Sequence, residues 1–415
     1  MLRNLVSVLF CFVLIQDGLA QQEVTVMSYN VLNFPTGNIE GREDTLRHII
    51  NHAEPDLFLI QELKNDSGLQ IILNESFADL PAAYEATTFV PQQSNPSSGF
   101  KLQQAMIYNS DLFGLASEGF LQTDVRDLNK FKLFYKDPEL TNGADTLFLY
   151  VFVVHLKSSQ GTSNVEARLA MAQTLSFHQQ YLEDNASIIV AGDFNVYSSE
   201  EPAYQELLDP TNRIRLRDPI NTPGDWNSSS FQPKSVLTQS TRASSIFGDG
   251  AGGGLDDRFD FILLSSDMFQ PWNTIVYEED SYYAMGNTGT CYNQSITDCS
   301  GGEWSDEMLQ SLYYMSDHLP IVLKLNMGVG SVSVDENHED LAKIWITDNQ
   351  LNIQWQKKET GIVSVVDMLG RSIFQKQVDL NSGSNRLDIP NIPVSGILSV
   401  TVQTDSQSRT IKVYP

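Results

Sequence analysis

The sequence predicts an α/β layered domain followed by a small all-β domain, on three observations. Short runs rich in β-branched and aromatic residues alternate with helical patterns through the first 327 residues, which is typical of layered α/β folds. Short strand-like runs separated by turn residues follow residue 341. Between the two regions, Gly328 to Asp340 is small, polar and acidic, as linkers are.

The predicted strands and helices of the first domain are interleaved along the chain. Several strand-like runs are apolar at nearly every position, which suits strands buried on both faces. Leu46, Ile49 and Ala53 follow a helical spacing that Pro55 closes, and a longer helical stripe runs from Val165 to Glu183. The strand-like runs are Val24–Tyr29, Leu57–Ile60, Ala105–Tyr108, Leu147–Val154, Ser187–Ala191, Phe259–Leu264 and Ile321–Leu325.

Composition and charge narrow the class of protein. With 41% hydrophobic residues among 415, the chain buries a large core and is not wholly disordered. No apolar run approaches the roughly 20 residues of a membrane span, so we expect no integral membrane segment. The formal net charge is −26, and residues 342–415 carry eight Lys/Arg and six Asp/Glu, so residues 1–341 carry −28. This acidity disfavours a protein that binds nucleic acid through a basic face, but it permits an enzyme that meets phosphate through a bound cation.

The first 20 residues are typical of a secretory signal peptide. Arg3 supplies a positive start, Leu5–Ile15 an apolar stretch, and Gly18 and Ala20 a small-residue cleavage site. We therefore expect the mature chain to begin near Gln21 and to leave the cytoplasm.

Cleavage would remove one of the three cysteines and leave Cys291 and Cys299. In an oxidising compartment this pair is able to close a small loop. It is not expected to bind a metal, because no further Cys or His lies nearby at ligand spacing. The surrounding acidic, aromatic segment Glu278–Met308 is either a substrate-facing flap or a surface loop.

Polar residues end five of the strand-like runs and interrupt a sixth. Because the ends of several buried strands meet at one rim of a sheet, we expect these side chains to gather where α/β folds place their chemistry. They are Asn30, Glu62, His155, Asp193 with Asn195, and Asp317 with His318 at the ends, and Asp260 within a run.

The residue types suit chemistry at a phosphate. Asn30 and Glu62 offer oxygen ligands to a hard cation such as Mg²⁺. The carboxylate of Asp193, beside the amide of Asn195, is able to orient an attacking water while the amide donates to a developing oxyanion.

Two histidines, His155 and His318, add acid–base capacity or hydrogen bonds to phosphate near neutral pH, and Asp260 is able to hold His318 in one tautomer. Taken singly, each polar residue has an ordinary explanation as a turn residue, a solvated strand end or a structural histidine. Their joint occurrence at strand ends favours a functional site.

These positions lie in motifs that resemble the endonuclease/exonuclease/phosphatase superfamily. That superfamily includes pancreatic deoxyribonuclease, abasic-site endonucleases, neutral sphingomyelinases and inositol-polyphosphate 5-phosphatases. The resemblance covers roughly Glu23 to Met327 and implies a four-layer α/β/β/α sandwich that hydrolyses phosphoesters with a divalent cation. The motifs, in the family's order, are MSYNVLNF, LIQEL, VVHLKS, VAGDFN, FDFILLS and SDHLPIVLKL.

The resemblance also assigns roles to residues of the metal site and to those around the attacking water. Glu62 would be the principal metal ligand, with Asn30 as a further ligand or positioner and Asp317 in or beside the site. Asp193 would activate or orient the attacking water, and Asn195 would stabilise the transition state.

The two histidines receive roles from the same resemblance. His318, oriented by Asp260, would act as a base or contact the phosphate, and His155 would contact the phosphate or protonate the leaving group. The cation would neutralise charge on the pentacoordinate phosphorus while a water attacks in line.

Four further features allow weaker interpretations. Tyr108 is either a phosphate contact or a core aromatic, and Arg168 is expected to pair with a carboxylate on its own helix. The segment Thr238–Arg242 either touches substrate phosphate or only precedes the Gly-rich stretch. That stretch, Gly248–Gly254, is either a flexible connector or, with its flanking aspartates, a structural Ca²⁺ site.

The last 70 or so residues resemble the type A sorting domain of the type IX secretion system of Bacteroidota. The resemblance rests on VVDMLGRSIFQ, Gly383-Ser-Asn385, Pro393 to Gly396 and the terminal TIKVYP. The usual entry motif rich in Tyr-Pro-Asn-Pro is missing before Trp345. The resemblance implies an export address that takes no part in catalysis.

We therefore predict a signal peptide over residues 1–20, a catalytic domain over 21–327, a linker over 328–341 and a β-sandwich sorting domain over 342–415. We expect a monomer that type IX secretion machinery exports to the cell surface or the extracellular space.

The predicted function is a secreted phosphodiesterase that depends on Mg²⁺ or Mn²⁺, and specifically a nuclease, expected to be an endonuclease, that hydrolyses extracellular nucleic acid, with DNA as the expected substrate. Two alternatives remain. One is a phosphatase or sphingomyelinase-type enzyme with the same site, although no obvious apolar hairpin for membrane docking is present. The other is a non-catalytic surface binding protein, which is disfavoured because every predicted site residue is present.

Overall fold

The computed structural model describes most of the chain, which forms two compact units, Met1–Val332 and Ser333–Pro415. The predicted signal peptide and nearly all of the predicted linker lie outside the described residues. Among the described residues, no helix is both long and apolar enough to cross a membrane. The described residues are 22–99, 101–138, 146–245, 247–271, 273–328, 344–347, 350–355, 357–367, 371–389, 398–404 and 408–413.

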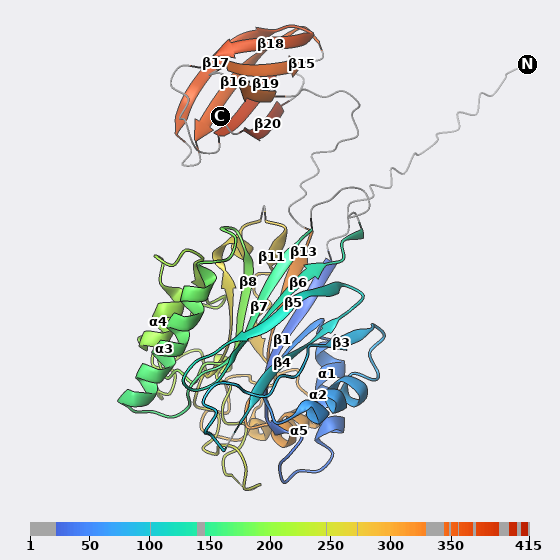
Figure 1. The fold of residues 1–415 in the computed structure, drawn as a ribbon, viewed down its shortest axis with the longest axis vertical. Helices are drawn as coiled ribbons and strands as arrows, with labels where there is room; N and C mark the ends of the chain where they lie inside the picture. Colours follow the sequence, from blue (N-terminus) through green and yellow to red (C-terminus); the bar gives the residue numbers. More distant parts are fainter. Residues whose placement is uncertain are drawn as a thin grey trace, which may run out of the picture. The chain divides into compact units, whose positions relative to one another are not determined.

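The first unit contains two large sheets (Figure 1). One has seven strands, in the order β11-β13-β1-β2-β4-β3, with β12 paired to β13. β1 and β2 pair in parallel, and the other pairs are antiparallel. The strands are β1 (Gln22–Phe34), β2 (Leu57–Leu63), β3 (Tyr84–Ala86), β4 (Gln103–Asn109), β11 (Ile275–Tyr277), β12 (Tyr283–Ala284) and β13 (Ile321–Met327).

The other sheet has six strands, in the order β5-β6-β7-β8-β10-β9. β7 and β8 pair in parallel, and the other pairs are antiparallel. The strands are β5 (Phe113–Leu121), β6 (Leu128–Tyr135), β7 (Phe148–His155), β8 (Ser187–Asp193), β9 (Leu216–Arg217) and β10 (Asp260–Ser265).

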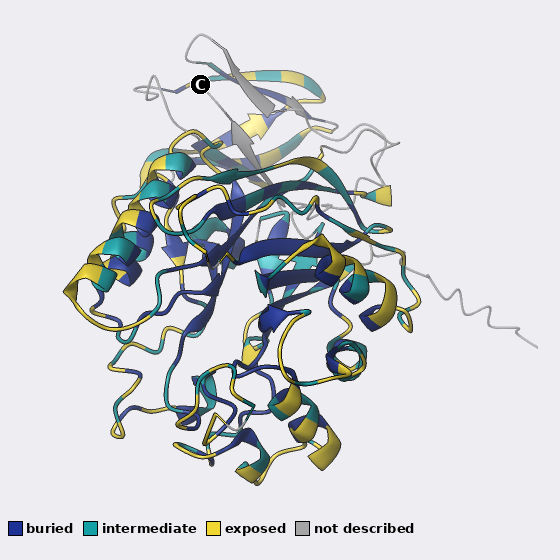
Figure 2. Ribbon diagram, turned by 60° about the horizontal axis from the view of Figure 1, so that its bottom comes forward, coloured by how far each residue is buried: buried dark blue, intermediate teal, exposed yellow. Residues whose placement is uncertain are grey.

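Helices cover the outer faces of the two sheets and complete the predicted four-layer α/β/β/α sandwich (Figure 1). One apolar core lies between the sheets, a second packs α1, α2 and α5 on the first sheet, and a third packs α3 and α4 on the second. In Figure 2 the strands are mostly buried and the outward turns of the helices exposed. The helices are α1 (Arg42–Ala53), α2 (Asp66–Ile71), α3 (Thr162–Gln179), α4 (Pro202–Leu208) and α5 (Asp306–Met315), with short turns at Ile72–Ser76, Lys234–Val236, Ser266–Phe269 and Ile296–Asp298.

The two-residue period of the strands carries polar side chains to one end of the core between the sheets. On β7 the core residues Val151 and Val153 are followed on the same face by His155. On β8 the core residue Ala191 is followed by Asp193. Both polar side chains therefore lie where the apolar packing between the sheets ends.

The second unit is all-β, as predicted. A three-stranded sheet has the order β14-β15-β18, and a four-stranded sheet has the order β17-β16-β19-β20. Side chains of both sheets share one small apolar core, which includes Leu351, Trp355, Val365 and Val400. The strands are β14 (Ile344–Thr347), β15 (Gln350–Trp355), β16 (Glu359–Asp367), β17 (Ser372–Leu380), β18 (Gly383–Asp388), β19 (Leu398–Thr404) and β20 (Ser408–Val413).

Candidate active site

Three neighbouring strands of the second sheet place polar side chains in one row. His155 on β7 pairs with Asp193 on β8, which in turn pairs with Asp260 on β10. All three side chains are buried. The strands approach closely at Gly192, where an added Cβ would lie 1.9 Å from the carbonyl oxygen of Val154. Glycine is therefore required directly before Asp193.

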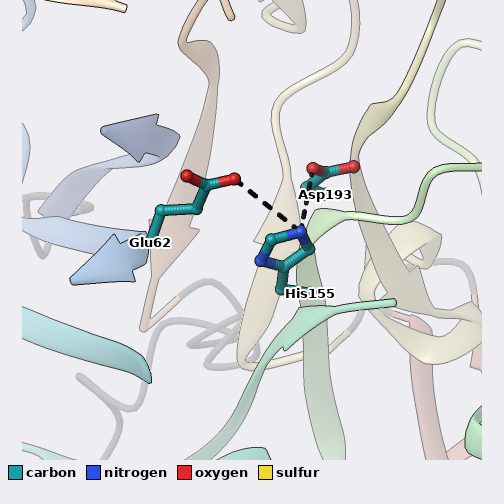
Figure 3. A group of neighbouring side chains, drawn as sticks. All are labelled: Glu62, His155 and Asp193. Carbon is teal, nitrogen blue, oxygen red and sulfur yellow. Dashed lines mark ion pairs between the residues drawn. The ribbon is translucent and has the colours of Figure 1, made fainter. Parts of the chain in front are cut away.

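Glu62 reaches this row from the opposite sheet. Leu57 and Leu59 of β2 face the core between the sheets, so simple alternation would turn Glu62 away from it. A φ of +65° at Glu62 and a shift in the β1–β2 register break the alternation. Oε1 of Glu62 lies 3.9 Å from Nε2 of His155, which lies 3.4 Å from Oδ2 of Asp193 (Figure 3).

Asn30 joins the two sheets at this point. Its side-chain NH₂ donates to Oε1 of Glu62 and to Oδ2 of Asp193, both at 3.1 Å. Its oxygen accepts from the backbone N–H of Leu32 at 3.0 Å. Asn30 is fully buried and lies within β1, which continues to Phe34 beyond the predicted strand end. The amide therefore fixes the separation of two carboxylates from different sheets.

Asn195 fixes the other oxygen of Asp193. Its backbone N–H and its side-chain NH₂ donate to Oδ1 of Asp193 at 3.0 and 2.7 Å. A φ of +52° at Asn195 turns the chain back towards the carboxylate, a conformation that asparagine tolerates better than most residues. Both oxygens of Asp193 are thus held by side-chain amides.

Asp260 orients His318. Nδ1 of His318 lies 2.8 Å from Oδ2 of Asp260, and Nε2 lies 3.7 Å from Oδ2 of Asp193. Burial alone would lower the pKa of His318, but the negative charges of Asp260 and Asp193 raise it well above its usual value. Asp260 is the first residue of β10, whereas the sequence placed it inside a strand.

Asp317 lies beside this group and is held by a neighbouring loop. Its Oδ2 accepts from the backbone N–H of Ala251 at 2.6 Å and from the side-chain amide of Gln239 at 3.3 Å. Its Oδ1 is buried and has no hydrogen-bond partner among the described residues. The charge of Asp317 helps to raise the pKa of Glu62, after the larger effect of burial.

Burial and like charges make the site unfavourable for ionised carboxylates. Burial, with repulsion from neighbouring carboxylates, raises the pKa of Asp193 to about 7. Burial lowers the pKa of His155 well below its usual value, and the positive charge of Arg126 lowers it further. A cation between the carboxylates would compensate their negative charge.

The donor set fits such a cation. Glu62, His155 and Asp193 each offer a ligand atom, and these atoms lie within 4.8 Å of one another. Of the predicted ligands, Glu62 belongs to this set and Asn30 bonds to two of its members, but through its NH₂ group. Asp317 contributes a buried oxygen without a partner beside the set. The described residues form no second group of this kind, so a Ca²⁺ ion at the Gly-rich stretch stays a prediction.

Two residues at the site were not predicted. The side-chain nitrogen of Gln239 lies 2.6 Å from Nε2 of His318 as well as contacting Asp317. Arg126 donates to the carbonyl oxygen of Leu156 at 2.7 Å, and its charge acts on Asp193. Gln239 lies within the TQSTR segment, which offered a signal, whereas nothing in the local pattern distinguishes Arg126 from a surface arginine.

The structure resolves two of the weaker interpretations. Tyr108 pairs with Leu57, at the end of β2 farther from Glu62, and donates to Glu85 at 2.6 Å. It therefore lies away from the site. The prediction for Arg168 is wrong: its ion pair is formed with Glu201, before α4, because the buried guanidinium reaches across to the next helix.

The TQSTR segment and the cysteine-bearing segment pack together. The predicted pair Cys291–Cys299 forms a disulfide. The backbone N–H of Ile296 and the hydroxyl of Ser295 donate to the carbonyl oxygen of Thr241 at 2.9 and 3.1 Å. The cross-linked segment thus supports the residues that contact Asp317 and His318.

Comparison with known protein families finds a match for each of the two regions of the chain. The model of the Endonuclease/Exonuclease/phosphatase family matches residues 27–318, and that of the secretion system C-terminal sorting domain matches residues 347–414. Among curated proteins, none matches this chain significantly.

Solved structures with a similar fold share little sequence with this chain. TDP2 from D. rerio, complexed with a single-stranded DNA product, is 16% identical, with a TM-score of 0.48 over 74% of this chain and 99% of that one. A mannosyl-6-phosphatase from Bacteroides thetaiotaomicron is 16% identical, with a TM-score of 0.43 over 73% and 99%. The human Nocturnin catalytic domain is 15% identical, with a TM-score of 0.44 over 74% and 97%. By the family match over most of its length, the chain belongs to the Endonuclease/Exonuclease/phosphatase family and carries a secretion system C-terminal sorting domain.

Proposed function

We propose that this chain is a secreted, Mg²⁺- or Mn²⁺-dependent phosphodiesterase that cleaves nucleic acid within the strand. The proposal rests on one observation: Glu62, from the first sheet, lies close to the buried row of His155, Asp193 and Asp260 on the second sheet. Family membership supports phosphoester hydrolysis. The sorting domain supports export by type IX machinery. Removal of the N-terminal signal before that export is part of the proposal. Extracellular nucleic acid is an abundant phosphodiester polymer outside cells, and DNA is the proposed substrate.

In this proposal Glu62, Asp193 and His155 would hold the cation, with Asn30 fixing the two carboxylates and Asp317 lending a further oxygen. When bound, the cation neutralises charge on the phosphoryl oxygens. Two amides hold Asp193 so that it is able to orient a water for in-line attack.

Two of the remaining residues act on the phosphate. Asn195, whose side-chain amide lies 2.7 Å from Asp193, would donate to the transition state. Asp260 holds His318 with its second nitrogen between Gln239, 2.6 Å away, and Asp193, so Gln239 would have to move aside for that nitrogen to contact a phosphoryl oxygen. His155, buried between the two sheets beside Glu62 and Asp193, would offer its side chain to the cation and not to the phosphate.

Nicking of supercoiled plasmid DNA tests the proposal. The full chain is compared with Glu62→Ala and with Glu166→Ala, which changes an exposed glutamate on α3. We expect nicking that requires Mg²⁺, is lost in Glu62→Ala and is retained in Glu166→Ala. A plasmid left intact by the wild-type chain would refute the nuclease assignment, and sphingomyelin and phosphorylated small molecules would be tested next.

A further inference from the structure

Two pockets lie beside α3. The first, of about 750 Å³, lies between α3, the loop at Gln93–Pro96 and the turn at Gln122–Val125. That turn leads directly into Arg126, whose charge acts on Glu62 and Asp193. Val125, which lines this pocket, is therefore the sequence neighbour of a side chain that acts on the site.

The same face of α3 continues into a second pocket. Ala167, Ala170, Met171 and Thr174 line the first pocket, and His178 lines a pocket of about 220 Å³. These positions follow the spacing of one helical face. We name the two pockets together the α3 groove.

Exposed aromatic rings gather at the far end of the α3 groove. Tyr181 is 70% exposed, Phe177 58% and Phe148 39%. Half of the large hydrophobic side chains that are exposed among the described residues lie here; the others are Tyr283, Tyr314 and Ile362. Isolated exposed rings are ordinary, but a group of them around a pocket indicates a binding surface.

Lysines accompany these rings. Lys130 and Lys132 on β6 alternate with the buried Phe131 and Leu133, so both lysines face outward into the second pocket. Nζ of Lys132 lies 4.0 Å from the ring centre of Phe148.

Two carboxylates lie nearby. Glu183 pairs with Lys132 and accepts from Tyr150 at 2.6 Å, whereas Glu118, which also lines the second pocket, accepts only from the backbone of Thr88 at 2.9 Å and keeps its negative charge. Lys130 contacts His178 at 3.4 Å and has no carboxylate within ion-pair distance among the described residues. Its charge is thus available to an anionic ligand.

We propose that the α3 groove binds the single-stranded part of a nucleic acid whose phosphodiester lies in the active site. Flat exposed rings stack with unpaired bases, and lysine ammonium groups attract the backbone phosphates. A duplex hides its base faces and would leave the rings uncovered. Tyr150 precedes His155 by five residues on β7, about 17 Å along the strand, so only a substrate of several nucleotides reaches both sites. This inference rests on the proposed nuclease function.

Binding without catalysis tests the groove. The full chain is mixed in EDTA with a fluorescent single-stranded DNA of 20 nucleotides, and the Kd is measured by anisotropy. The double variant Lys130→Ala/Tyr181→Ala should bind about tenfold more weakly. Tyr283→Ala, which changes an exposed ring elsewhere on the chain, should bind like the wild type.

Kinetic measurements distinguish a loss of binding in the groove from a loss of catalysis at the active site. With Mg²⁺, the double variant should raise KM for the 20-nucleotide strand about tenfold without changing kcat. Its hydrolysis of bis(p-nitrophenyl) phosphate, too small to reach the groove, should be unchanged. Equal Kd values for wild type and double variant, or tighter binding of the groove to duplex DNA or soluble starch, would overturn the inference. A wild-type chain that binds the strand but cuts no nucleic acid would instead overturn the proposed function.

Discussion

Asp260 and His318 share a buried hydrogen bond of 2.8 Å that joins the first residue of β10 to the turn before β13. Because the carboxylate occupies Nδ1, the ring can present only Nε2 to the neighbouring Asp193. The backbone N–H groups of Phe259 and Asp260 donate to the hydroxyl of Thr238, which fixes the start of β10. The imidazole is thus oriented by a residue that need not contact substrate.

Asp260→Asn should lower kcat for plasmid nicking by between about 10²- and 10⁴-fold, because an amide neither compensates a charged imidazole nor fixes its tautomer. The variant should still fold, since the change keeps the side-chain shape. Steady-state kinetics and a thermal melt check both statements. Asp225→Asn, at an exposed aspartate, is the control, and equal activity in the two variants would show that Asp260 does not act through His318.

Gly250→Ala should disturb Asp317. Gly250 has a φ of +78°, and an added Cβ would lie 2.9 Å from Cγ of Asp317. Gly253 in the same loop has a φ of +119° but nothing within 4 Å of an added Cβ. Gly253→Ala therefore shares the backbone strain without the clash.

We expect Gly250→Ala to raise the Mg²⁺ concentration needed for half-maximal activity, and Gly253→Ala to leave it unchanged. Both variants should lose about 1 kcal/mol of stability through strain at positive φ, and Gly250→Ala should lose more because of its clash with Asp317. Mg²⁺ titrations of nicking activity, together with urea unfolding, measure the two effects. An identical Mg²⁺ requirement in both variants would remove Asp317 from the metal site.

Asp257 should make the stability of the fold depend on pH. Burial is the main reason that its pKa rises from the usual range of an aspartate to about 7. Since the folded state binds the proton more tightly, Asp257 stabilises the fold fully below about pH 4, and this contribution is lost as pH rises through 7.

Asp257→Asn removes this titration, so it should match the wild type at pH 4 and exceed it at pH 8 by about 2 to 4 kcal/mol. The oxygen of the introduced amide is still able to accept the 2.8 Å hydrogen bond that Asn227 donates to Asp257. Urea unfolding at both pH values measures the difference. Glu166→Gln, at the exposed glutamate on α3, is the control, and a constant offset across the pH range would contradict the prediction.

Loss of the Cys291–Cys299 disulfide should destabilise the first unit by about 2 kcal/mol, the loop entropy expected for a separation of eight residues. Cys299→Ala is the suitable change because Cys291 lies in the core. Urea unfolding of the wild type in dithiothreitol should reproduce the loss, and the variant should show no further effect of the reductant. A variant as stable as the oxidised wild type would contradict the expectation.

Much of the fold and site followed from the sequence because strand ends are local features. His155 and Asp193 end apolar runs, and the parallel pairing of β7 and β8 brings them together. Glu62 was found in the same way, although it reaches the site only through a φ of +65° that no periodicity reveals. The position of Glu62 at the end of a strand-like run predicted that it belongs to the site, but the sequence did not predict the direction in which its side chain points.

Residues that act through long-range contacts were harder to predict. Arg168 has carboxylates near it in sequence, but burial and the packing of α3 on α4 favour Glu201. Arg126 and Gln239 lie in loops whose paths depend on how both sheets pack. Such contacts are properties of the tertiary structure. Gln239 had a local signal, because it lies within the TQSTR segment, whereas Arg126 had none.

The bonds of Asn30 to Glu62 and Asp193 connect carboxylates that belong to different sheets. Neither sheet by itself contains the complete candidate site, so a partly folded chain with unpacked sheets lacks that site. The candidate site and the native packing of the two sheets therefore form together. Activity measured on this protein therefore reports only on molecules whose two sheets have packed together. Inside the cell that synthesises the chain, the site is complete only in the compartment where this packing takes place.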